Sequence, residues 1–332
     1  NTGEVLTLLS YPDFNPNTYN LDFTKLESDS RSPLLNRVTR GAYPPGSAFK
    51  PIVVASALHE GIISRSTTWF DAPYPHGSGG WEPEYGKRCV YGPHGTIDIL
   101  RGLQVSCNIP FYEIGKELGI DKLSELAKGF GFNQKTGIDL YPEEVTGLIP
   151  DRQWKKNAFS KADDKVWYPI ETLDVAIGQG ATQVTPVQMV QFYAAIANGG
   201  KILQPYLVAQ IVDAEGNIVQ EAEPVVTGDL GLKKTDLQII QEGMERVTAT
   251  GGTAARAFDG FPLKVAGKTG SAEVPGKQSH AWFAGYLPAD DPKYAVCVFV
   301  ENGGSGGANA APIAREIFER YLFPEVFLED ES

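Results

Sequence analysis

The stretch that most restricts how this chain can fold runs from residue 43 to residue 51, with the sequence YPPGSAFKP. Two prolines and a glycine do not fit inside a helix, but they can deliver the chain to a helix start, where missing amide protons cost little. We therefore predict that a helix begins at Ser47 and is ended by Gly61. Its run Ile52–Leu58 is apolar almost all round, so the helix should be central and buried.

Ser47 and Lys50 are three residues apart, which places both side chains on one face of this helix. Burial lowers the pKa of a lysine, and the neutral amine can then act as a base toward a neighbouring hydroxyl. This pairing predicts a serine nucleophile. Taken alone, Ser-x-x-Lys is a weak signal, because a serine and a lysine at this spacing are common on a solvated helix face.

Two more motifs strengthen the prediction. Ser106-Cys107-Asn108 and then the Lys-Thr-Gly-Ser run that starts at Lys268 follow in the order expected of penicilloyl serine transferases. Each alone has an ordinary explanation, since Ser-x-Asn is often a helix cap and Lys-Thr-Gly often a strand end before a turn. Three motifs in order, on a predicted helix, loop and strand, are not explained in that way. With these motifs the chain resembles a penicillin-binding protein.

Longer runs extend the resemblance over essentially the whole chain. TGEVL and SYPDFNPN near the start, HGT at 94–96, GQGATQVTPVQM at 178–189 and ENGG at 301–304 resemble the elongation-specific class B enzymes. The resemblance implies a peptidoglycan D,D-transpeptidase. Such an enzyme cross-links stem peptides through a serine acyl-enzyme in cell-wall elongation, and β-lactams acylate and inhibit it.

The resemblance also implies partners and a location. The family works with a SEDS-family glycosyltransferase and an elongation-complex scaffold, on the extracytoplasmic (periplasmic) face of the bacterial cytoplasmic membrane. An N-terminal membrane helix and a pedestal domain precede its catalytic domain, and this sequence shows neither. We expect the chain to be part of a longer protein, because it opens in a strand-like run with no initiator methionine or signal sequence.

Catalytic roles follow from the motif match. The resemblance implies that Ser47 attacks the carbonyl between two D-alanines and that Lys50 takes its proton. Ser106 would pass a proton to the departing D-alanine, and Asn108 would hold the substrate amide. Acyl transfer requires a nucleophile, a base, a proton donor for the leaving amine and a site for the oxyanion.

The remaining motif supplies the binding roles that the resemblance implies. Lys268 and Thr269 would orient the serine of the second motif and bind the terminal carboxylate of the substrate. Gly270 would let a peptide backbone approach closely, because it has no side chain. The backbone amides of Ser47 and Ser271 would form the oxyanion hole.

The pattern of elements predicts an α/β fold. Three strand-like runs at 263–274, 280–287 and 294–301 predict an antiparallel meander, and a helix is expected at 312–322. We expect the strand at 4–10 to join this sheet and the last helix and the helical middle to cover its two faces. This matches the penicilloyl serine transferase (transpeptidase and serine β-lactamase-like) fold, an antiparallel sheet flanked by helices with an inserted all-helical subdomain. We assign residues 1–60 and 250–332 to the sheet lobe and about 61–249 to the helical subdomain.

Further helices, loops and a hairpin are predicted between these parts. Helices are expected at 97–118 with an interruption at the second motif, at 122–130, at 187–198 and at 234–249. A hairpin is expected at 208–219. Residues 18–43, 136–149 and 151–167 are expected to be irregular or exposed. The segment 67–95 is too long for a structureless loop in a compact domain without a reason.

Composition excludes several classes of protein. The net charge of −12 and a pI near 4.9 argue against a nucleic-acid partner, because phosphate binding requires a basic face. No run of 18 or more apolar residues is long enough to span a bilayer. Three cysteines are too few and too irregularly spaced for a disulfide framework.

The segment before the second motif gathers four residue types that bind zinc: Asp71, Cys89, His94 and Cys107. Two thiolates, an imidazole and a carboxylate would close a tetrahedral structural site and tie a Gly/Pro-rich segment to the catalytic loop. Some elongation-type members are similar in having metal ligands in this region. Ordinary explanations remain open, namely a small buried cysteine, a histidine in a turn and a free thiol. The chemistry itself requires no cofactor.

Three other functions remain open. A serine β-lactamase or β-lactam sensor domain shares the nucleophile, the lysine and the Lys-Thr-Gly motif, although no sequence element clearly supplies a base for deacylation. A noncatalytic scaffold could keep the fold, but all the catalytic residue types are present. A D,D-carboxypeptidase uses the same acyl-enzyme with water as the acceptor, and motifs do not identify the acceptor.

Overall fold

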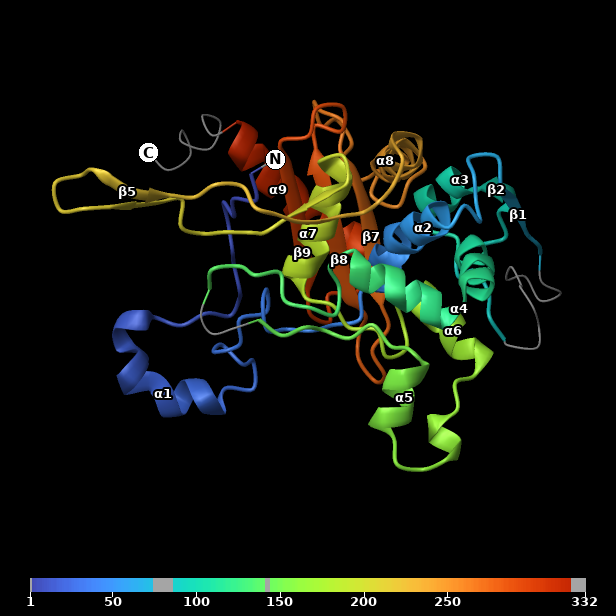
Figure 1. Cartoon of the computed structure of the whole chain (residues 1–332), viewed down its shortest axis with the longest axis horizontal. Helices are drawn as coiled ribbons and strands as arrows, with labels where there is room; N and C mark the ends of the chain where they lie inside the picture. Colours follow the sequence, from blue (N-terminus) through green and yellow to red (C-terminus); the bar gives the residue numbers. More distant parts are fainter. Residues whose placement is uncertain (1, 74–85, 141–143, 324–332) are drawn as a thin grey trace.

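A three-stranded antiparallel sheet lies at the centre of the fold. The computed structural model describes residues 2–73, 86–140 and 144–323. The sheet has the order β7-β8-β9, formed by β7 (Ala266–Ala272), β8 (His280–Leu287) and β9 (Tyr294–Val300). This confirms the predicted meander, whose apolar runs are separated by short polar turns (Figure 1).

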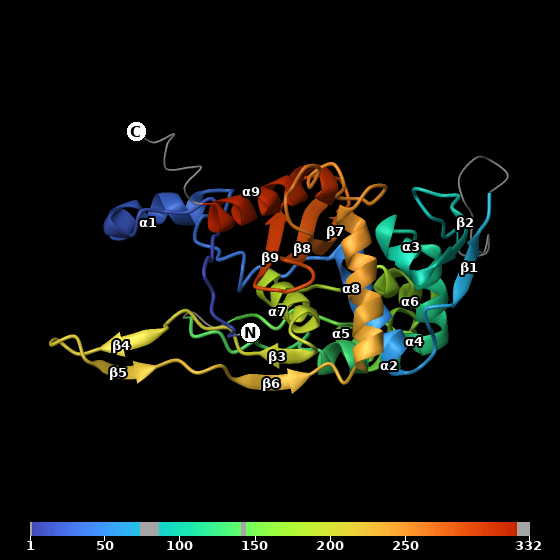
Figure 2. The same cartoon turned by 90° about the horizontal axis from the view of Figure 1, so that it is seen from above.

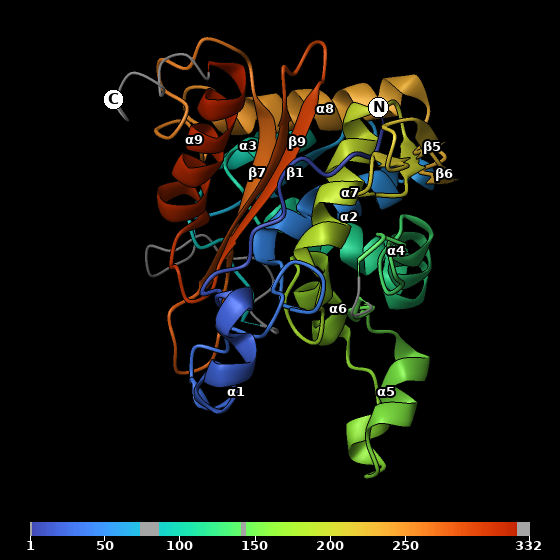
Figure 3. The ribbon, with the colours of Figure 1, turned by 90° about the vertical axis from the view of Figure 1, so that its left-hand side faces the viewer.

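Helices cover both faces of this sheet. Because strand side chains alternate between faces, Trp282, Ala284 and Tyr286 of β8 pack in one apolar cluster with α7 (Pro186–Ala197). Ala281 and Phe283 pack in another cluster with α9 (Ala311–Leu322). Figure 3 shows α9 on one side of the sheet and α7 on the other. The two predicted helices therefore begin and end within a residue of their predicted bounds.

The helix after the first motif is buried, as its apolar run predicts. All residues of α2 (Lys50–His59) except the last are buried. It contacts α4 (Ile109–Gly129) and α8 (Lys234–Thr248). α3 (Ile99–Gln104) and α4 are separated by the second motif, which confirms the predicted interruption, and α4 also includes the short helix predicted at 122–130. The same helical part includes α6 (Pro169–Ala176).

The other elements are short. The predicted hairpin is formed by β4 (Gln210–Val212) and β5 (Ile218–Glu221), which extends away from the sheet (Figure 2). The ends of the segment 67–95 pair as β1 (Thr68–Asp71) and β2 (Gly95–Asp98), while residues 74–85 lie outside the described residues. The rest are η1 (Pro16–Thr18), η2 (Gly46–Phe49), α5 (Arg152–Ala158), η4 (Asp163–Lys165), β3 (Lys201–Leu203), β6 (Val226–Asp229) and η5 (Gly306–Ala310).

Three helices were not predicted, namely α5, α6 and the first helix of the chain. Residues 18–43 were expected to be irregular, but they contain α1 (Tyr19–Ser28). None of the residues of α1 is buried. The helix therefore has no apolar stripe facing the core, which is the feature that sequence periodicity can detect.

The prediction for the opening segment was wrong. Residues 4–10 neither form a regular strand nor pair with the sheet. The amide of Val5 donates instead to the carbonyl of Tyr206 at 2.8 Å. The hydroxyl of Tyr321, near the end of α9, donates to the carbonyl of Leu6 at 3.1 Å. Neither of these partners belongs to β9.

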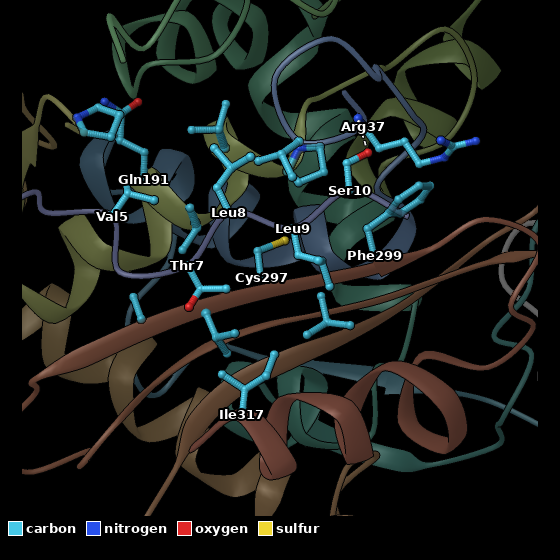
Figure 4. Close-up of a pocket in the computed structure, with 18 of the residues that line it drawn as sticks. Val5, Thr7, Leu8, Leu9, Ser10, Arg37, Gln191, Cys297, Phe299 and Ile317 are labelled. Carbon is cyan, nitrogen blue, oxygen red and sulfur yellow. Dashed lines mark hydrogen bonds between the residues drawn. The ribbon is translucent and has the colours of Figure 1, made fainter. Parts of the chain in front are cut away.

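A cavity of about 1170 Å³ lies between the opening segment and β9. Figure 4 shows Leu8 and Leu9 of the segment, with Cys297 and Phe299 of β9, among the side chains that line it. The apolar pattern at the start of the chain therefore indicates side chains that turn toward the sheet, but it does not identify the hydrogen-bond partner of the backbone. The residues lining this cavity include none from the three motifs.

The proposed division into two subdomains stays a prediction. The helices α7 and α8 belong to the range assigned to the helical subdomain, yet both contact the sheet. One apolar cluster contains Phe49 of η2, Phe192 of α7 and Trp282 of β8. Among the described helices, none has both the length and the apolar character needed to cross a membrane.

Candidate active site

The first motif forms a tight turn that leads into the buried helix. The 3₁₀ turn η2 includes Ser47, and α2 follows directly from Lys50. The predicted helix start is therefore correct to within a few residues, although Ser47 lies in the 3₁₀ turn rather than in α2. Gly46 has φ +53°, a left-handed conformation that favours glycine. Ser47 is only partly buried while its neighbours Gly46 and Ala48 are buried, so part of Ser47 is accessible to solvent.

Three contacts from distant parts of the chain hold this turn. The amide of Gly46 donates to the carbonyl of Gly178 at 2.9 Å. The indole Nε1 of Trp282 donates to the carbonyl of Pro44 at 3.0 Å, and the hydroxyl of Tyr193 donates to the carbonyl of Ala48 at 2.9 Å. Sequence reasoning missed all three contacts. For two of them the available signal was a Tyr in a predicted helix and a Trp in a predicted strand, since the polar tip of each requires a partner when it is buried.

Gly270 allows β7 to pack against the nucleophile turn. A Cβ atom at this position would lie 2.6 Å from the carbonyl oxygen of Pro45 and 3.0 Å from the amide nitrogen of Ala48. This close approach is to the backbone of the chain itself, so the predicted approach of a substrate backbone stays a prediction. We infer that the glycine of the third motif sets the distance between the turn and the strand.

Lys50 extends from α2 into the loop of the second motif. Its Nζ donates to the carbonyl of Ser106 and to Oδ1 of Asn108, each at 2.7 Å. Longer contacts of 3.2 and 3.3 Å join Nζ to Ser106 Oγ and to the carbonyl of Cys107. The lysine is fully buried, and burial lowers its pKa to about 8. The predicted shift in the pKa of this lysine therefore has the expected direction and cause.

Lys268 reaches the same serine from the opposite side. Its Nζ donates to Ser106 Oγ at 3.0 Å and to the carbonyl of Thr269 at 2.9 Å. Burial first, and then the nearby charge of Lys50, lowers the pKa of Lys268 well below its ordinary value. Two buried amines therefore converge on one hydroxyl.

The second motif holds Ser106 in an unusual backbone conformation. Ser106 has φ +57°, in the left-handed region that non-glycine residues rarely adopt. Such a conformation is found where surrounding contacts require it, often at functional sites. Asn108, two residues further along, donates through Nδ2 to the carbonyl of Arg88 at 3.3 Å and to the hydroxyl of Tyr112 at 3.4 Å. The motif is therefore fixed on both sides.

The structure thus brings Lys50, Ser106, Asn108 and Lys268 into one hydrogen-bonded network. Ser47 makes no side-chain hydrogen bond to any residue that the structure describes, so its partnership with Lys50 stays a prediction. In the third motif, Oγ of Ser271 accepts a hydrogen bond from the amide of Gly306 in η5 at 3.1 Å. The oxyanion and carboxylate roles of this motif also stay predictions.

The four residues expected to bind zinc lie beside this network. One ligand atom from each of Asp71, Cys89, His94 and Cys107 lies within 4.8 Å of every other. Oδ2 of Asp71 is 2.7 Å from Nδ1 of His94 and accepts from the thiol of Cys107 at 3.4 Å. A hydrogen bond between the two thiols lowers the pKa of Cys89 and raises that of Cys107.

Comparison with known proteins identifies the family. The sequence model of the family described as "Penicillin binding protein transpeptidase domain" matches residues 1–319. The chain belongs to this family. The fold described above is the penicilloyl serine transferase fold of these transpeptidase domains.

Curated relatives in the family include the peptidoglycan D,D-transpeptidase MrdA of Escherichia coli K12, which is 35% identical over 344 residues. That match covers 97% of this chain and 53% of the relative. MrdA of Haemophilus influenzae is 34% identical, with 96% of this chain and 51% of the relative covered. The chain therefore spans about half the length of the curated relatives it matches.

Solved structures of the family have the same fold. The Pseudomonas aeruginosa PBP2 complex with WCK 5153 matches with a TM-score of 0.82 at 34% identity, covering 97% of this chain and 69% of that one. The Helicobacter pylori complex between PBP2 and MreC matches with a TM-score of 0.77 at 31% identity, covering 94% of this chain and 57% of that one.

Proposed function

We propose that this chain is the catalytic domain of a peptidoglycan D,D-transpeptidase of the elongation-specific class B type. The observation that carries the proposal is the convergence of two buried lysines on Ser106, one of them Lys50, three residues after the partly exposed Ser47. The names of its relatives, peptidoglycan D,D-transpeptidase MrdA, support the same reaction.

The reaction would begin with Ser47. Its Oγ attacks the carbonyl between two D-alanines, and the neutral form of Lys50, which the lowered pKa makes more abundant, takes the hydroxyl proton. The C–N bond then breaks, and the departing amine of D-alanine takes a proton from Ser106, which the lysines can replenish. An acceptor amine attacks the resulting ester and forms the new C–N bond, and as the C–O bond breaks the proton lost by this amine passes to Ser47 Oγ, which is released as the hydroxyl. Backbone amides of Ser47 and Ser271 would stabilise the oxyanion in both steps.

A β-lactam would follow the first half of this path, with its ring amide in place of the peptide. The matched test is intact-mass spectrometry after mixing with benzylpenicillin. We expect one stable adduct on the wild type and on Ser56→Ala, and none on Ser47→Ala. Ser56 is the control because it is also on α2, where its hydroxyl bonds to the carbonyl of Ile52 at 2.9 Å and to no other residue that the structure describes.

The outcomes of this test separate the alternatives. A wild-type adduct that disappears while the drug is consumed would indicate a β-lactamase. A wild type that forms no adduct would indicate a noncatalytic scaffold, and an adduct that persists in Ser47→Ala would remove this serine from its role. Supplying a stem pentapeptide with and without a second stem peptide then distinguishes a cross-linked product from one shortened by hydrolysis.

We also propose that Asp71, Cys89, His94 and Cys107 bind a structural zinc ion. The carboxylate, imidazole and two thiols match the ligands that zinc prefers, and ligand atoms around tetrahedral zinc are about 3.3 to 3.8 Å apart. In support, the four atoms already lie within 4.8 Å of one another, and the buried Oδ1 of Asp71 has no hydrogen-bond partner among the described residues. The ion would join β1 and the start of β2 to the second motif and would leave the acyl-transfer steps to the side chains.

Metal analysis tests this site directly. Protein purified without added metal should contain about one zinc per chain, because structural sites bind tightly. Cys89→Ser should lose most of it, while Cys297→Ser should retain it, because Cys297 lies on β9 outside the cluster. A wild type without zinc, with Cys89 and Cys107 reactive to thiol reagents, would contradict the proposal.

Partners and location are proposed on the same basis. We propose that the longer protein is anchored in the cytoplasmic membrane with this domain on its outer face. Parts outside this chain would contact a SEDS-family glycosyltransferase and an elongation scaffold. In support, one structural relative is a complex of PBP2 with MreC.

Two experiments test these proposals. Size-exclusion chromatography should show these partners binding the full-length protein but not residues 1–332. A membrane-impermeant fluorescent penicillin should label spheroplasts. Binding by residues 1–332 alone, or unlabelled spheroplasts, would contradict these proposals.

A further inference from the structure

A hydroxyl outside the three motifs contacts the third motif. Thr253 lies in the turn between α8 and β7, and its Oγ1 is 2.6 Å from Oγ1 of Thr269. This short distance requires one hydroxyl to donate to the other. Thr269 is almost fully buried, with 6% of its surface exposed. Each hydroxyl has no other side-chain hydrogen bond to the described residues.

The backbone fixes Thr253 in this position. Its amide donates at 3.2 Å to the carbonyl of Gln104, the last residue of α3 before the second motif. The following amide, of Ala254, donates to the carbonyl of Val247 at 2.9 Å. A Cβ atom at Gly307 would lie 2.3 Å from the carbonyl oxygen of Thr253, so η5 packs closely on its other side. The contact with Thr269 is therefore part of a rigid junction.

The direction of the bond between the two hydroxyls depends on what Thr269 binds. An ionised carboxylate only accepts hydrogen bonds, so Thr269 must direct its single proton to a carboxylate that it binds. In the hydrogen bond between the two threonines, Thr253 must then be the donor. Because Thr253 has no other acceptor among the described residues, its proton is available for this bond.

We propose that Thr253 is a positioning residue for recognition of the substrate carboxylate. It donates to Thr269, and Thr269 in turn donates to the terminal carboxylate of the stem peptide or to the carboxylate of a β-lactam. The inference rests on the proposed function, because it assigns the carboxylate site to Thr269. Chains of hydrogen bonds strengthen one another, so loss of the first donor weakens the second bond.

The test compares two acylating agents. The second-order acylation constant is measured with benzylpenicillin and with its methyl ester, in which the carboxylate is masked. For Thr253→Val we expect the constant for benzylpenicillin to fall about 3- to 10-fold, the effect of one neutral hydrogen bond. The constant for the ester should change less than about twofold. Thr253→Ser should restore the wild-type ratio, because it restores the hydroxyl.

A nearby threonine provides the control. Thr248 lies at the end of α8, and its hydroxyl bonds to the carbonyls of Glu245 and Val265 at 3.0 and 2.5 Å. Thr248→Val also removes a hydroxyl from this region, but it should leave the ratio of the two acylation constants unchanged. If Thr253→Val does not fold, Thr253→Ala provides the same comparison without an added methyl group.

A double-mutant cycle distinguishes action through Thr269 from a general structural effect. In a Thr269→Val background, Thr253→Val should cause no further loss of preference for the free carboxylate. Equal losses with both agents, or additive losses in the double variant, would overturn the inference. If the wild type is acylated at equal rates by the two agents, this inference is overturned but the proposed function is not. If the wild type forms no acyl-enzyme, the proposed function and this inference are overturned together.

Discussion

The position of Ser47 should depend on a glycine that is distant in sequence. Gly178 has φ +71°, and a Cβ atom there would lie 2.2 Å from the carbonyl oxygen of Gly46. Gly178→Ala therefore has two effects. An L-residue in the left-handed region costs about 1 to 2 kcal/mol. In addition, the two atoms must separate by about 0.8 Å before they reach 3.0 Å, the lower limit of real Cβ contacts.

Gly61→Ala is the matched control. Gly61 has φ +70°, nearly the same as Gly178, but a Cβ atom there would have no atom within 4 Å. Both variants should lose about 1 to 2 kcal/mol in the free energy of unfolding, measured in urea, from the backbone term. Only Gly178→Ala also displaces the nucleophile turn.

The acylation rate separates the two effects. A misplacement of about 1 Å in a catalytic group can reduce the rate about 10²-fold, so we expect Gly178→Ala to be acylated by benzylpenicillin at least about 10-fold more slowly than Gly61→Ala. Stopped-flow or quenched-mass measurements give the rate constants. Equal rates in the two variants would show that the contact with Gly178 does not position Ser47.

Three further predictions follow from single features of the site. Burial lowers the pKa of Lys50 to about 8. Because the neutral amine is the base, the acylation rate constant should rise with pH, pass its midpoint near 8 and then level off. A rate constant independent of pH would contradict this role. Tyr193→Phe removes the donor to the carbonyl of Ala48, so urea unfolding should show a loss of about 1 kcal/mol and acylation should slow, while an unchanged rate would show that the turn does not require this bond. Chelation of zinc should lower the melting temperature of the wild type by about 5 to 10 °C but leave that of Cys89→Ser unchanged. Equal effects on both proteins would argue against the proposed zinc site.

The pH dependence of stability follows from the same lysine. The pKa of Lys50 in the folded chain lies below its ordinary value of 10.5. Between about 8 and 10.5 the unfolded chain therefore binds more protons than the folded chain, so the contribution of Lys50 to stability increases as the pH rises through this window. Below the window both states are protonated and the contribution is constant at its least favourable value.

Local patterns in the sequence were sufficient to predict the elements that carry the motifs. The two prolines and Gly46 predicted the start of the buried helix, and the apolar runs separated by turns predicted the meander. Both patterns depend on neighbours in the chain, which a single sequence displays. The opening segment shows the limit of this reasoning, because the same apolar pattern fits a strand and a segment whose first backbone bond is to Tyr206.

The supports of the site could not be predicted in the same way. Trp282 lies 238 positions from Pro44, and Tyr193 lies 145 positions from Ala48. No spacing rule connects residues so far apart, and only the folded chain places them together. Thr253 could not be predicted for a related reason. It lies 16 positions before Thr269, and nothing in the sequence indicates that these two hydroxyls form a hydrogen bond.

The hydrogen bonds of Lys50 are consistent with its proposed change of charge during acylation. A neutral amine has two protons, and the two shortest contacts, to the carbonyl of Ser106 and to Asn108, accept both at 2.7 Å. The lone pair then remains for the proton of Ser47. Once the amine is charged, its third proton can bond to Ser106 Oγ, which lies 3.2 Å away. Because Lys268 also donates to this oxygen, both of its lone pairs are then occupied, and the proton of Ser106 itself must point to a third group, which in the proposed reaction is the departing amine.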